Sequence, residues 1–172
     1  MLPVRPGVLL VASPLLTDPN FARSVVYVLE HNDRGTLGLI INRPLDIAIG
    51  ELWSDCPSPW RDQRRCGDGG PVERDKGLVL HGDTDLPDAM PLGAGLAVGG
   101  DTAALDPADP LGPRLFLGHS GWSDGQLDNE LAIGSWLVRN GNRHLALDPD
   151  CSDGLWEELV RTNEEGPAPS VN

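Results

Sequence analysis

The feature that most constrains the fold is a pair of extended, β-branched runs separated by four turn-forming residues. The runs cover residues 24–31 (SVVYVLEH) and 36–42 (TLGLIIN), and Asn32-Asp33-Arg34-Gly35 lies between them. Val, Ile and Tyr favour extended backbone, whereas Asn, Asp and Gly favour tight turns. The sequence therefore predicts an antiparallel β-hairpin, and this hairpin favours antiparallel pairing elsewhere in the sheet.

Shorter apolar runs predict the remaining elements. Further strands are expected at 7–12, 77–81, 95–99, 114–118 and 135–138, and helices at 124–133 and 155–160. Ser123 and Gln126 match a capping box at the start of the first helix, and Asp18-Pro19 predicts a single helical turn. Strands outnumber helices and do not alternate with them, so an α+β fold is favoured over a doubly wound parallel sheet.

Length and composition predict one globular domain. A chain of 172 residues that is 40% hydrophobic can bury a core without metals or disulfides. We expect one domain over residues 1–166, with a mobile internal loop at 54–71 that holds three Pro and three Gly, and a disordered tail at 167–172. No long apolar run and no signal-like start are present, so a cytoplasmic protein with no membrane association is expected.

The charge balance narrows the choice of partners. Thirteen basic residues stand against 26 acidic ones, giving a net charge of −13, which disfavours direct binding to nucleic-acid phosphates. Residues 77–113 hold six Asp and no Lys or Arg, and we interpret the acidic face that they form as solvated.

Cys56, Cys66 and Cys151 form an odd set with no C-x-x-C motif, which indicates reduced thiols in the cytosol. Cys151 precedes a predicted helix, where a thiolate can be favoured. A redox role is therefore the alternative to a small, semi-buried residue.

One segment invites comparison with the nucleophile elbow of hydrolases. Residues 118–122 read GHSGW, and Asp128 and His144 follow Ser120 in the order of a catalytic triad. Trp122 stands where the sharp elbow needs its second glycine, so we interpret this segment as a structural turn.

A second segment could hold a metal ion. His81, Asp83 and Asp85 would share one face if their strand continued, but Gly82 and the acidic run indicate that the strand has ended. We expect no metal site, no cofactor and no catalytic residues here.

Three blocks of the sequence together resemble the AlgH/YqgE family of bacterial proteins. These blocks are residues 10–44, residues 69–72 (GGPV) with 77–81 (GLVLH), and residues 121–130 (GWSDGQLDNE) with Ser135-Trp136. The resemblance implies an α+β fold in which a mainly antiparallel, bent or bifurcated sheet forms a pseudo-barrel with helices outside. The chain departs from the family pattern at His119-Ser120 and in the insert at 54–66. The family is largely uncharacterised, has no established catalytic residues and is often described as transcriptional regulators.

The leading hypothesis is a cytoplasmic binding or regulatory protein that acts through a protein partner or a small ligand. Candidate binding residues are the polar side chains at strand ends or turns within the resembling blocks: Asp18, Asn20, Arg23, His31, Asn32, Asn42, Arg43 and His81. One alternative is a hydrolase with His31, His81 or His119 as general base. A direct DNA-binding regulator is a further alternative, which the acidic charge disfavours.

Overall fold

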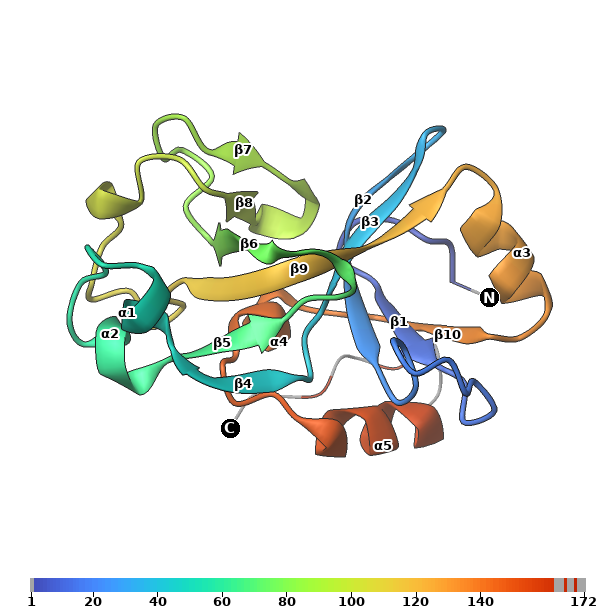
Figure 1. Cartoon of the computed structure of the whole chain (residues 1–172). Coiled ribbons are helices and arrows are strands. Elements are labelled where there is room, and N and C mark those ends of the chain that lie inside the picture. Colours follow the sequence, from blue (N-terminus) through green and yellow to red (C-terminus); the bar gives the residue numbers. More distant parts are fainter. Residues whose placement is uncertain (1, 163–165, 167–168, 170–172) are drawn as a thin grey trace.

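The predicted hairpin forms the middle of a ten-stranded, mostly antiparallel sheet (Figure 1). The structure is a computed structural model that describes residues 2–162, 166 and 169. Its strands are β1 (Leu9–Ala12), β2 (Val25–Asn32), β3 (Gly35–Ile40), β4 (Pro44–Ala48), β5 (Arg65–Asp68), β6 (Val72–His81), β7 (Met90–Pro91), β8 (Ala97–Val98), β9 (Arg114–Ser123) and β10 (Trp136–Arg139).

Strand β9 belongs to both halves of this sheet. Its last residues, 120–123, pair antiparallel with β3 and complete the order β10-β1-β2-β3-β9. Its first residues, 114–117, pair antiparallel with β6, and residues 116–117 also pair in parallel with β5. Figure 1 shows β9 running from one half of the molecule into the other. The expected α+β fold with a bifurcated antiparallel sheet is confirmed, and the sheet curls into a half-barrel.

The sheet divides where two glycine-containing segments touch through their backbones. Gly69 accepts a hydrogen bond from the Ile40 amide (2.9 Å) and donates one to the Leu117 carbonyl (2.8 Å). A Cβ at Gly69 would lie 2.3 Å from the Gly118 carbonyl oxygen, and Gly118 itself has φ +75°. Side chains are excluded at this crossing, and β9 bends there without ending.

The interpretation of residues 118–122 as a structural turn is therefore wrong. These residues continue β9, and Ser120 to Ser123 pair in register with Gly38 to Gly35 of β3. The bend at Gly118 carries the strand from one half of the sheet to the other, which a short apolar run followed by Gly cannot reveal.

Alternation along β1 and β2 explains why both strands read as unbroken apolar runs. On β1, Leu9 and Val11 pack into one core cluster, whereas Leu10 and Ala12 pack into another on the opposite face. Tyr27 continues the first cluster on β2. Successive side chains of a strand point to opposite faces, so a strand that is buried on both faces needs apolar residues throughout.

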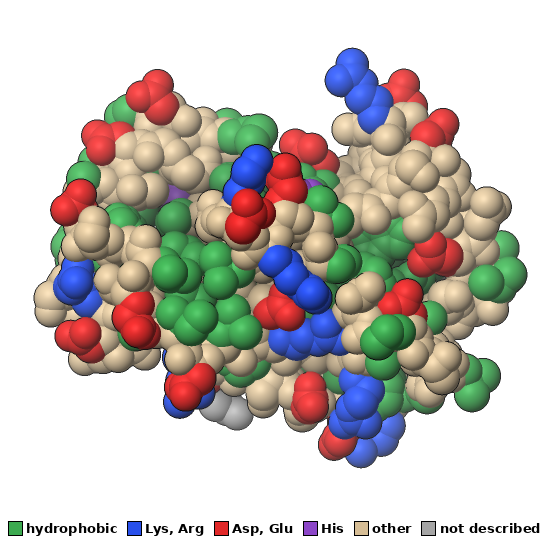
Figure 2. Space-filling model, in the orientation of Figure 1, with side chains coloured by type: hydrophobic (Ala, Val, Ile, Leu, Met, Phe, Trp, Pro, Cys, Tyr) green, Lys and Arg blue, Asp and Glu red, His purple; other side chains and the backbone are tan. Residues whose placement is uncertain are grey.

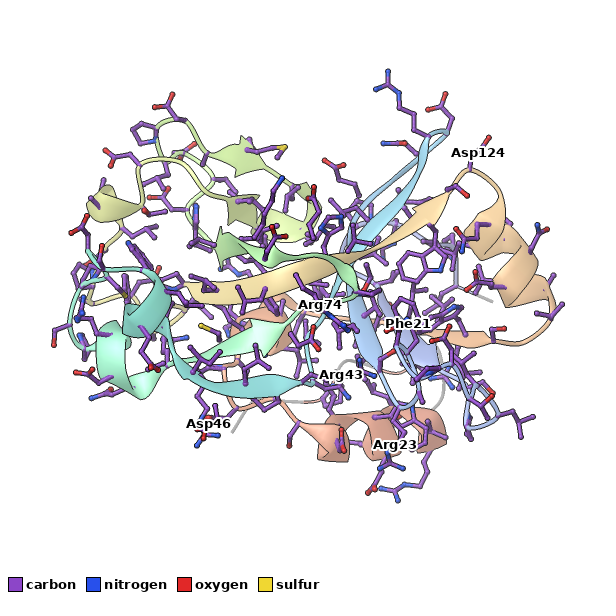
Figure 3. The ribbon with its side chains drawn as sticks, in the orientation of Figure 1. Phe21, Arg23, Arg43, Asp46, Arg74 and Asp124 are labelled. Atoms are coloured by element: carbon purple, nitrogen blue, oxygen red, sulfur yellow. The ribbon has the colours of Figure 1, made fainter. Side chains whose placement is uncertain are left out.

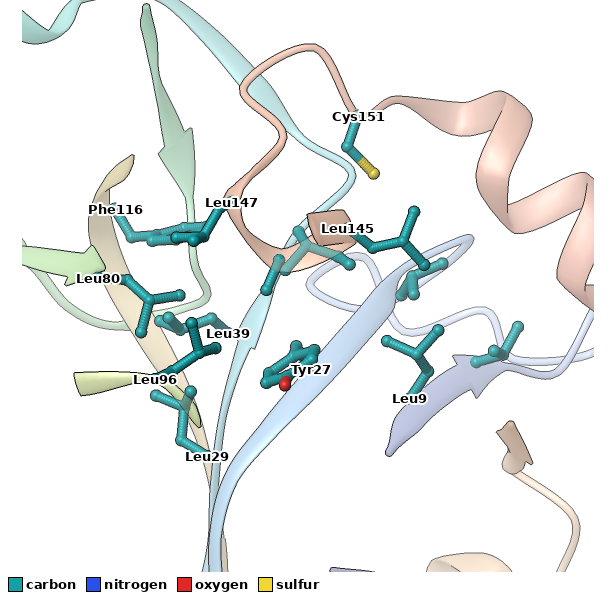
Figure 4. Close-up of a cluster of buried hydrophobic side chains, with 14 of the residues drawn as sticks. Leu9, Tyr27, Leu29, Leu39, Leu80, Leu96, Phe116, Leu145, Leu147 and Cys151 are labelled. Carbon is teal, nitrogen blue, oxygen red and sulfur yellow. The ribbon is translucent and has the colours of Figure 1, made fainter. Parts of the chain in front are cut away.

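Five short α-helices in the described part of the chain pack around the sheet. They are α1 (Ile49–Leu52), α2 (Trp60–Gln63), α3 (Gln126–Ala132), α4 (Arg143–Leu147) and α5 (Asp153–Arg161). Helices α4 and α5 complete the first core cluster with Leu145, Leu147 and Trp156. Figure 4 shows Leu145 and Leu147 of α4 among the buried side chains of this cluster. None of the helices in the described part of the chain has both the length and the apolar character that crossing a lipid bilayer requires.

The segment at 54–71, which we expected to be a mobile loop without regular structure, contains α2 and β5. Its cysteines Cys56 and Cys66 and its Trp60 are buried, at 2%, 0% and 4% exposure, in a third core cluster. Each element has only four residues, too few to show a hydrophobic period. The tail predicted at 167–172 lies largely outside the described residues.

The glycine crossing yields a stability prediction. A Cβ at Gly70 (φ +144°) would lie 2.3 Å from the His119 carbonyl oxygen, so Gly70→Ala should lower the free energy of unfolding by about 3 kcal/mol. Gly154→Ala is the control. Its Cβ would enter open space in α5, so it should raise stability by up to about 1 kcal/mol. Urea denaturation measures both, and equal effects would contradict this account of the crossing.

Candidate functional site

The eight residues predicted to bind a partner lie in three separate places. Asp18, Asn20, Arg23, Asn42 and Arg43 meet at one end of the β2–β3 hairpin. His31 and Asn32 lie at its other end, which the eight residues of β2 place about 25 Å away at about 3.3 Å per residue. His81 ends β6, in the other half of the sheet. A single site that contains all eight residues is excluded.

Asn42 and Arg43 hold the loop at 18–23 against the hairpin. Asn42 is buried; its Oδ1 accepts a hydrogen bond from the Val25 amide (2.9 Å), and its Nδ2 donates one to the Arg23 carbonyl (2.9 Å). The Arg43 guanidinium donates to the Asn20 carbonyl (2.6 Å) and the Ala22 carbonyl (3.0 Å). These two side chains therefore position the loop, and both polar atoms of the buried Asn42 side chain already have a backbone partner.

Asp18 and Arg23 are themselves part of this loop, and their contacts fix its conformation. Asp18 Oδ1 accepts from the Asn20 amide (2.7 Å), and its carbonyl accepts from the Ala22 amide (2.7 Å), which agrees with the predicted helical turn. Arg23 has φ +61°, and its guanidinium lies 4.4 Å from the ring centre of Trp156 while it donates to Glu157 (3.1 Å). The Arg23 side chain remains half exposed.

A third arginine extends this surface across the division of the sheet. Arg74 of β6 lies 3.9 Å from the Asp68 carboxylate, and the Asp68 amide donates to the Arg43 carbonyl (2.9 Å). Figure 3 shows Arg74, Arg43 and Arg23 following one another across one face of the molecule. We call these three residues the arginine band. Sequence reasoning missed Arg74, because its position in the fold depends on the glycine crossing.

Hydrophobic side chains lie next to the arginine band. Figure 2 shows them as a green area over β4, β5, β6 and β9. The half-buried hydrophobic residues of these strands that pack on the third core cluster are Leu45, Ile47, Val79 and Leu117. We call these four residues the apolar patch. Together with the arginine band it forms a surface with both basic and apolar character.

A hydrogen-bond network fixes α3 beside the 18–23 loop. Glu130 Oε1 accepts from the indole N–H groups of Trp122 (3.2 Å) and Trp136 (2.9 Å), and Gln126 donates to its other oxygen (3.0 Å). Phe21 packs on both indoles, with ring centroids 5.9 and 5.6 Å apart. Trp122 is thus a packing anchor. Gln126 also accepts from the Ser123 amide (3.0 Å), but α3 begins at Gln126 with Gly125 as its N-cap, so the capping box predicted with Ser123 at the helix start is wrong. The role of Glu130 was missed, although its i, i+4 spacing from Gln126 is a usable signal.

The histidines do not assemble a hydrolase site. His31 shares a hydrogen bond with Thr36 (2.7 Å), whereas His81 Nδ1 accepts from the Asp83 amide (3.2 Å) and Nε2 donates to the Gly99 carbonyl (2.8 Å). Ser120 is fully buried and donates to the Gly69 carbonyl (3.1 Å). His81, His31 and His144 each line a different pocket.

The residues considered as metal ligands have other partners. Asp83 Oδ1 accepts from the Asp85 amide (3.1 Å), which closes a turn after β6. Across residues 2–162, no group of three His, Cys, Asp or Glu side chains has the arrangement of a metal site.

The three cysteines are buried thiols with no disulfide partner in the described structure. Burial raises the pKa of Cys66 to about 11 and that of Cys151 to about 12, although nearby Arg114 acts in the opposite direction. Both thiols are protonated at neutral pH, so the redox alternative for Cys151 finds no support in its environment.

Comparison with known proteins places this architecture in a class. The bent, bifurcated sheet is shared with a Corynebacterium diphtheriae protein solved by X-ray crystallography (TM-score 0.76, 27% identity, covering 92% of this chain and 87% of that one). It is also shared with the AlgH protein of Pseudomonas aeruginosa, solved in solution (TM-score 0.71, 31% identity, covering 94% and 92%). The fold is that of the AlgH-like proteins.

The sequence match identifies the family itself. Residues 9–167 match the AlgH-like family, and the chain belongs to it. A relative from Myxococcus xanthus, named only as a UPF0301 protein, is 39% identical over 174 residues, 96% of this chain and 93% of its own length. Another from Thermobifida fusca is 41% identical over 172 residues, 90% and 85% of the two chains. These names state no activity, and the family's function is uncharacterised.

The buried thiols yield a prediction of pH dependence. Their pKa values are raised above the ordinary 9.0, so their contribution to stability is complete below pH 9 and is lost as pH rises towards 11–12. At pH 10 the loss should be about 1.4 kcal/mol per thiol. Urea denaturation from pH 8 to 10 should show stability falling, and Cys66→Ala/Cys151→Ala should flatten this slope.

The control for this measurement is Val138→Ala, which truncates a buried side chain that does not titrate. It should lower stability by the same amount at each pH and leave the slope unchanged. An unchanged slope in the cysteine variant would show that these thiols are not the groups responsible.

Proposed function

We propose that this chain is a binding protein that regulates by docking a protein partner on the arginine band and the apolar patch. The observation that carries this proposal is the gathering of Arg23, Arg43 and Arg74 on one face of a chain with a net charge of −13. The preferred partner presents an acidic segment together with apolar side chains.

The chemistry of arginine supports this choice of partner. A guanidinium group is planar, stays charged and binds carboxylates through paired hydrogen bonds. Arg43 uses backbone carbonyls as its partners, and the Arg74–Asp68 pair is long at 3.9 Å, so their positive charge is incompletely neutralised. Acidic residues elsewhere on the chain repel an acidic partner. The electrostatic field of the chain would therefore direct such a partner to the arginine band.

The rigid setting of the band also suits a docking surface. Asn42 and the Trp122–Glu130–Trp136 network hold the 18–23 loop from two sides, so little ordering is needed when a partner binds. Pre-organised surfaces lose less conformational entropy on association.

We place this activity in the cytoplasm, because the three buried thiols are unpaired in the described structure and suit a reducing compartment.

The test compares two double variants that carry the same change of charge. Proteins that co-purify with the tagged chain from lysate are identified by mass spectrometry, and the best candidate is purified for direct affinity measurement. Arg23→Gln/Arg74→Gln should weaken its binding by up to about 25-fold, because each exposed ion pair is worth up to about 1 kcal/mol, or about fivefold. Arg34→Gln/Arg161→Gln, at exposed positions outside the band, should leave the affinity unchanged.

Two results would overturn the proposal. Equal weakening by both double variants would assign the effect to overall charge, and no effect of either would place the interface elsewhere. Tight binding of duplex DNA with a steep salt dependence would favour a direct DNA-binding regulator instead.

A further inference from the structure

A groove lies between the loop that follows β1 and the turn that joins α3 to β10. Its volume is about 240 Å³; residues 13–18 form one wall and residues 133–135 form the other. The Ser13 amide donates to the Ser135 carbonyl (2.9 Å), so the two walls are joined by a hydrogen bond. Helix α3, whose end forms part of this groove, lies at the opposite end of the molecule from α1 and α2 (Figure 1). None of the lining residues belongs to the arginine band or the apolar patch.

Two strongly exposed hydrophobic side chains line the groove. Leu15 is 88% exposed and Ile133 is 80% exposed, whereas the exposed Leu52 and Met90 elsewhere on the chain reach 50% and 55%. Leu16 also lines the groove and is half-buried against the second core cluster. Single exposed apolar residues are common on protein surfaces, but several that surround one hollow indicate an interaction site.

The backbone of both walls is fixed by hydrogen bonds. In the first wall, Ser13 Oγ accepts from the Leu15 amide (3.2 Å). In the second wall, Gly134 has φ +80°, and the Ser135 amide donates back to the Glu130 carbonyl (2.9 Å) in the manner of a Schellman motif that ends α3. The groove is therefore pre-organised, and little ordering is needed when a partner docks there.

The groove is negative in charge. Asp18 is the only charged residue among those that line it, and its Oδ1 accepts from the Asn20 amide (2.7 Å). Within residues 2–162, Asp18 forms no ion pair with a basic side chain. The carbonyl end of α3, which carries the negative end of the helix dipole, also meets the groove. On a chain with a net charge of −13, this setting favours a basic group beside the apolar side chains.

We propose that this groove docks a segment of a protein partner in which a leucine-sized apolar side chain stands beside a lysine or arginine. The apolar side chain enters the groove and contacts Leu15, Leu16 and Ile133, and the basic side chain pairs with the Asp18 carboxylate. A second copy of this chain is disfavoured, because a two-fold interface would bring two negative grooves together. This docking is independent of the arginine band, which favours a partner segment of the opposite charge.

The probe is the peptide acetyl-Lys-Leu-Leu-Lys-amide, and two matched peptides isolate its two features. Acetyl-Glu-Leu-Leu-Glu-amide reverses the charge, and acetyl-Lys-Ser-Ser-Lys-amide removes the apolar side chains. NMR titrations of the full chain measure the affinities and locate the contact through the Gly134 amide and the Ile133 methyl groups. The first peptide should shift both signals and bind at least about tenfold more tightly than either matched peptide.

Leu15→Ser/Ile133→Ser tests the apolar walls, and truncating such exposed side chains costs the fold little. This variant should bind the Lys-Leu-Leu-Lys peptide at least about tenfold more weakly, because the apolar contact is lost. Leu52→Ser/Met90→Ser is the control. It removes two exposed hydrophobic side chains outside the groove and should bind the peptide like the parent chain.

Asp18→Asn tests the charge without disturbing the loop, because Asn keeps the Oδ1 acceptor for the Asn20 amide. This variant should bind the same peptide up to about fivefold more weakly. Asp55→Asn makes the same change of charge at an exposed position outside the groove and should leave the affinity unchanged.

Any of three results overturns the proposal: unmoved Gly134 and Ile133 signals at the highest peptide concentration, equal affinity for the three peptides, or equal affinity of the two double variants. A dimer in sedimentation experiments that Leu15→Ser/Ile133→Ser abolishes would assign the groove to a second copy instead. Unfolding temperatures of all variants confirm that each is folded. These measurements involve no residue of the arginine band, so their failure leaves partner docking on the band untouched.

Discussion

The close backbone contact between Gly69-Gly70 and residues 117–119 is the constraint on which the rest of the structure depends. Through it, the Ile40 amide at the end of β3 and the Leu117 carbonyl on β9 both find their hydrogen-bond partner in Gly69. Any side chain at this point would push the two halves of the sheet apart. The arginine band exists because the contact brings Arg74 of β6 beside Arg43, which follows β3 in the other half.

A second constraint lies beneath the sheet, where Arg114 is fully buried. Its guanidinium lies 4.5 Å from the ring centre of Phe116 and donates one hydrogen bond, to the Ala146 carbonyl at 3.3 Å, while Nε and Nη2 have no partner. Burial lowers its pKa to about 10. Such a group costs stability, and it connects β9 to the last turn of α4, where carbonyl groups favour a cation.

Sequence reasoning predicted the elements that are long enough to show a pattern of apolar residues or that are joined by residues typical of turns. The β2–β3 hairpin falls into this group because two continuous β-branched runs surround a four-residue turn, and α5 does because apolar residues such as Trp156 recur at i, i+4. It failed for α2 and β5, which have four residues each, and for the continuation of β9 beyond Gly118. Their structure is set by neighbours distant in sequence, such as β4 and β3. Propensity carries no information about such contacts.

The residues of the candidate sites also divide into those that the sequence indicated and those whose grouping depends on the fold. Asn42 and Arg43 were found because they follow a strand end within a recognisable block, but their role as loop anchors depends on the carbonyls of residues 20–23. Three of the six Asp residues in the stretch interpreted as a solvated face line the same pocket as Trp60, and Trp60 lies in the segment expected to be a mobile loop. A polar residue can be recognised from sequence, whereas convergence of several such residues needs the fold.

The sharing of β9 between the two halves of the sheet has a consequence for how the molecule opens. A strand that is hydrogen-bonded to β3, β5 and β6 cannot detach from one neighbour while its other partners hold it in place. Neither half therefore behaves as an independent folding unit, and the amides in the middle of β9 exchange with solvent only when the whole domain unfolds. Local opening is confined to the two edge strands, β7 and β10, which end the strand order on either side.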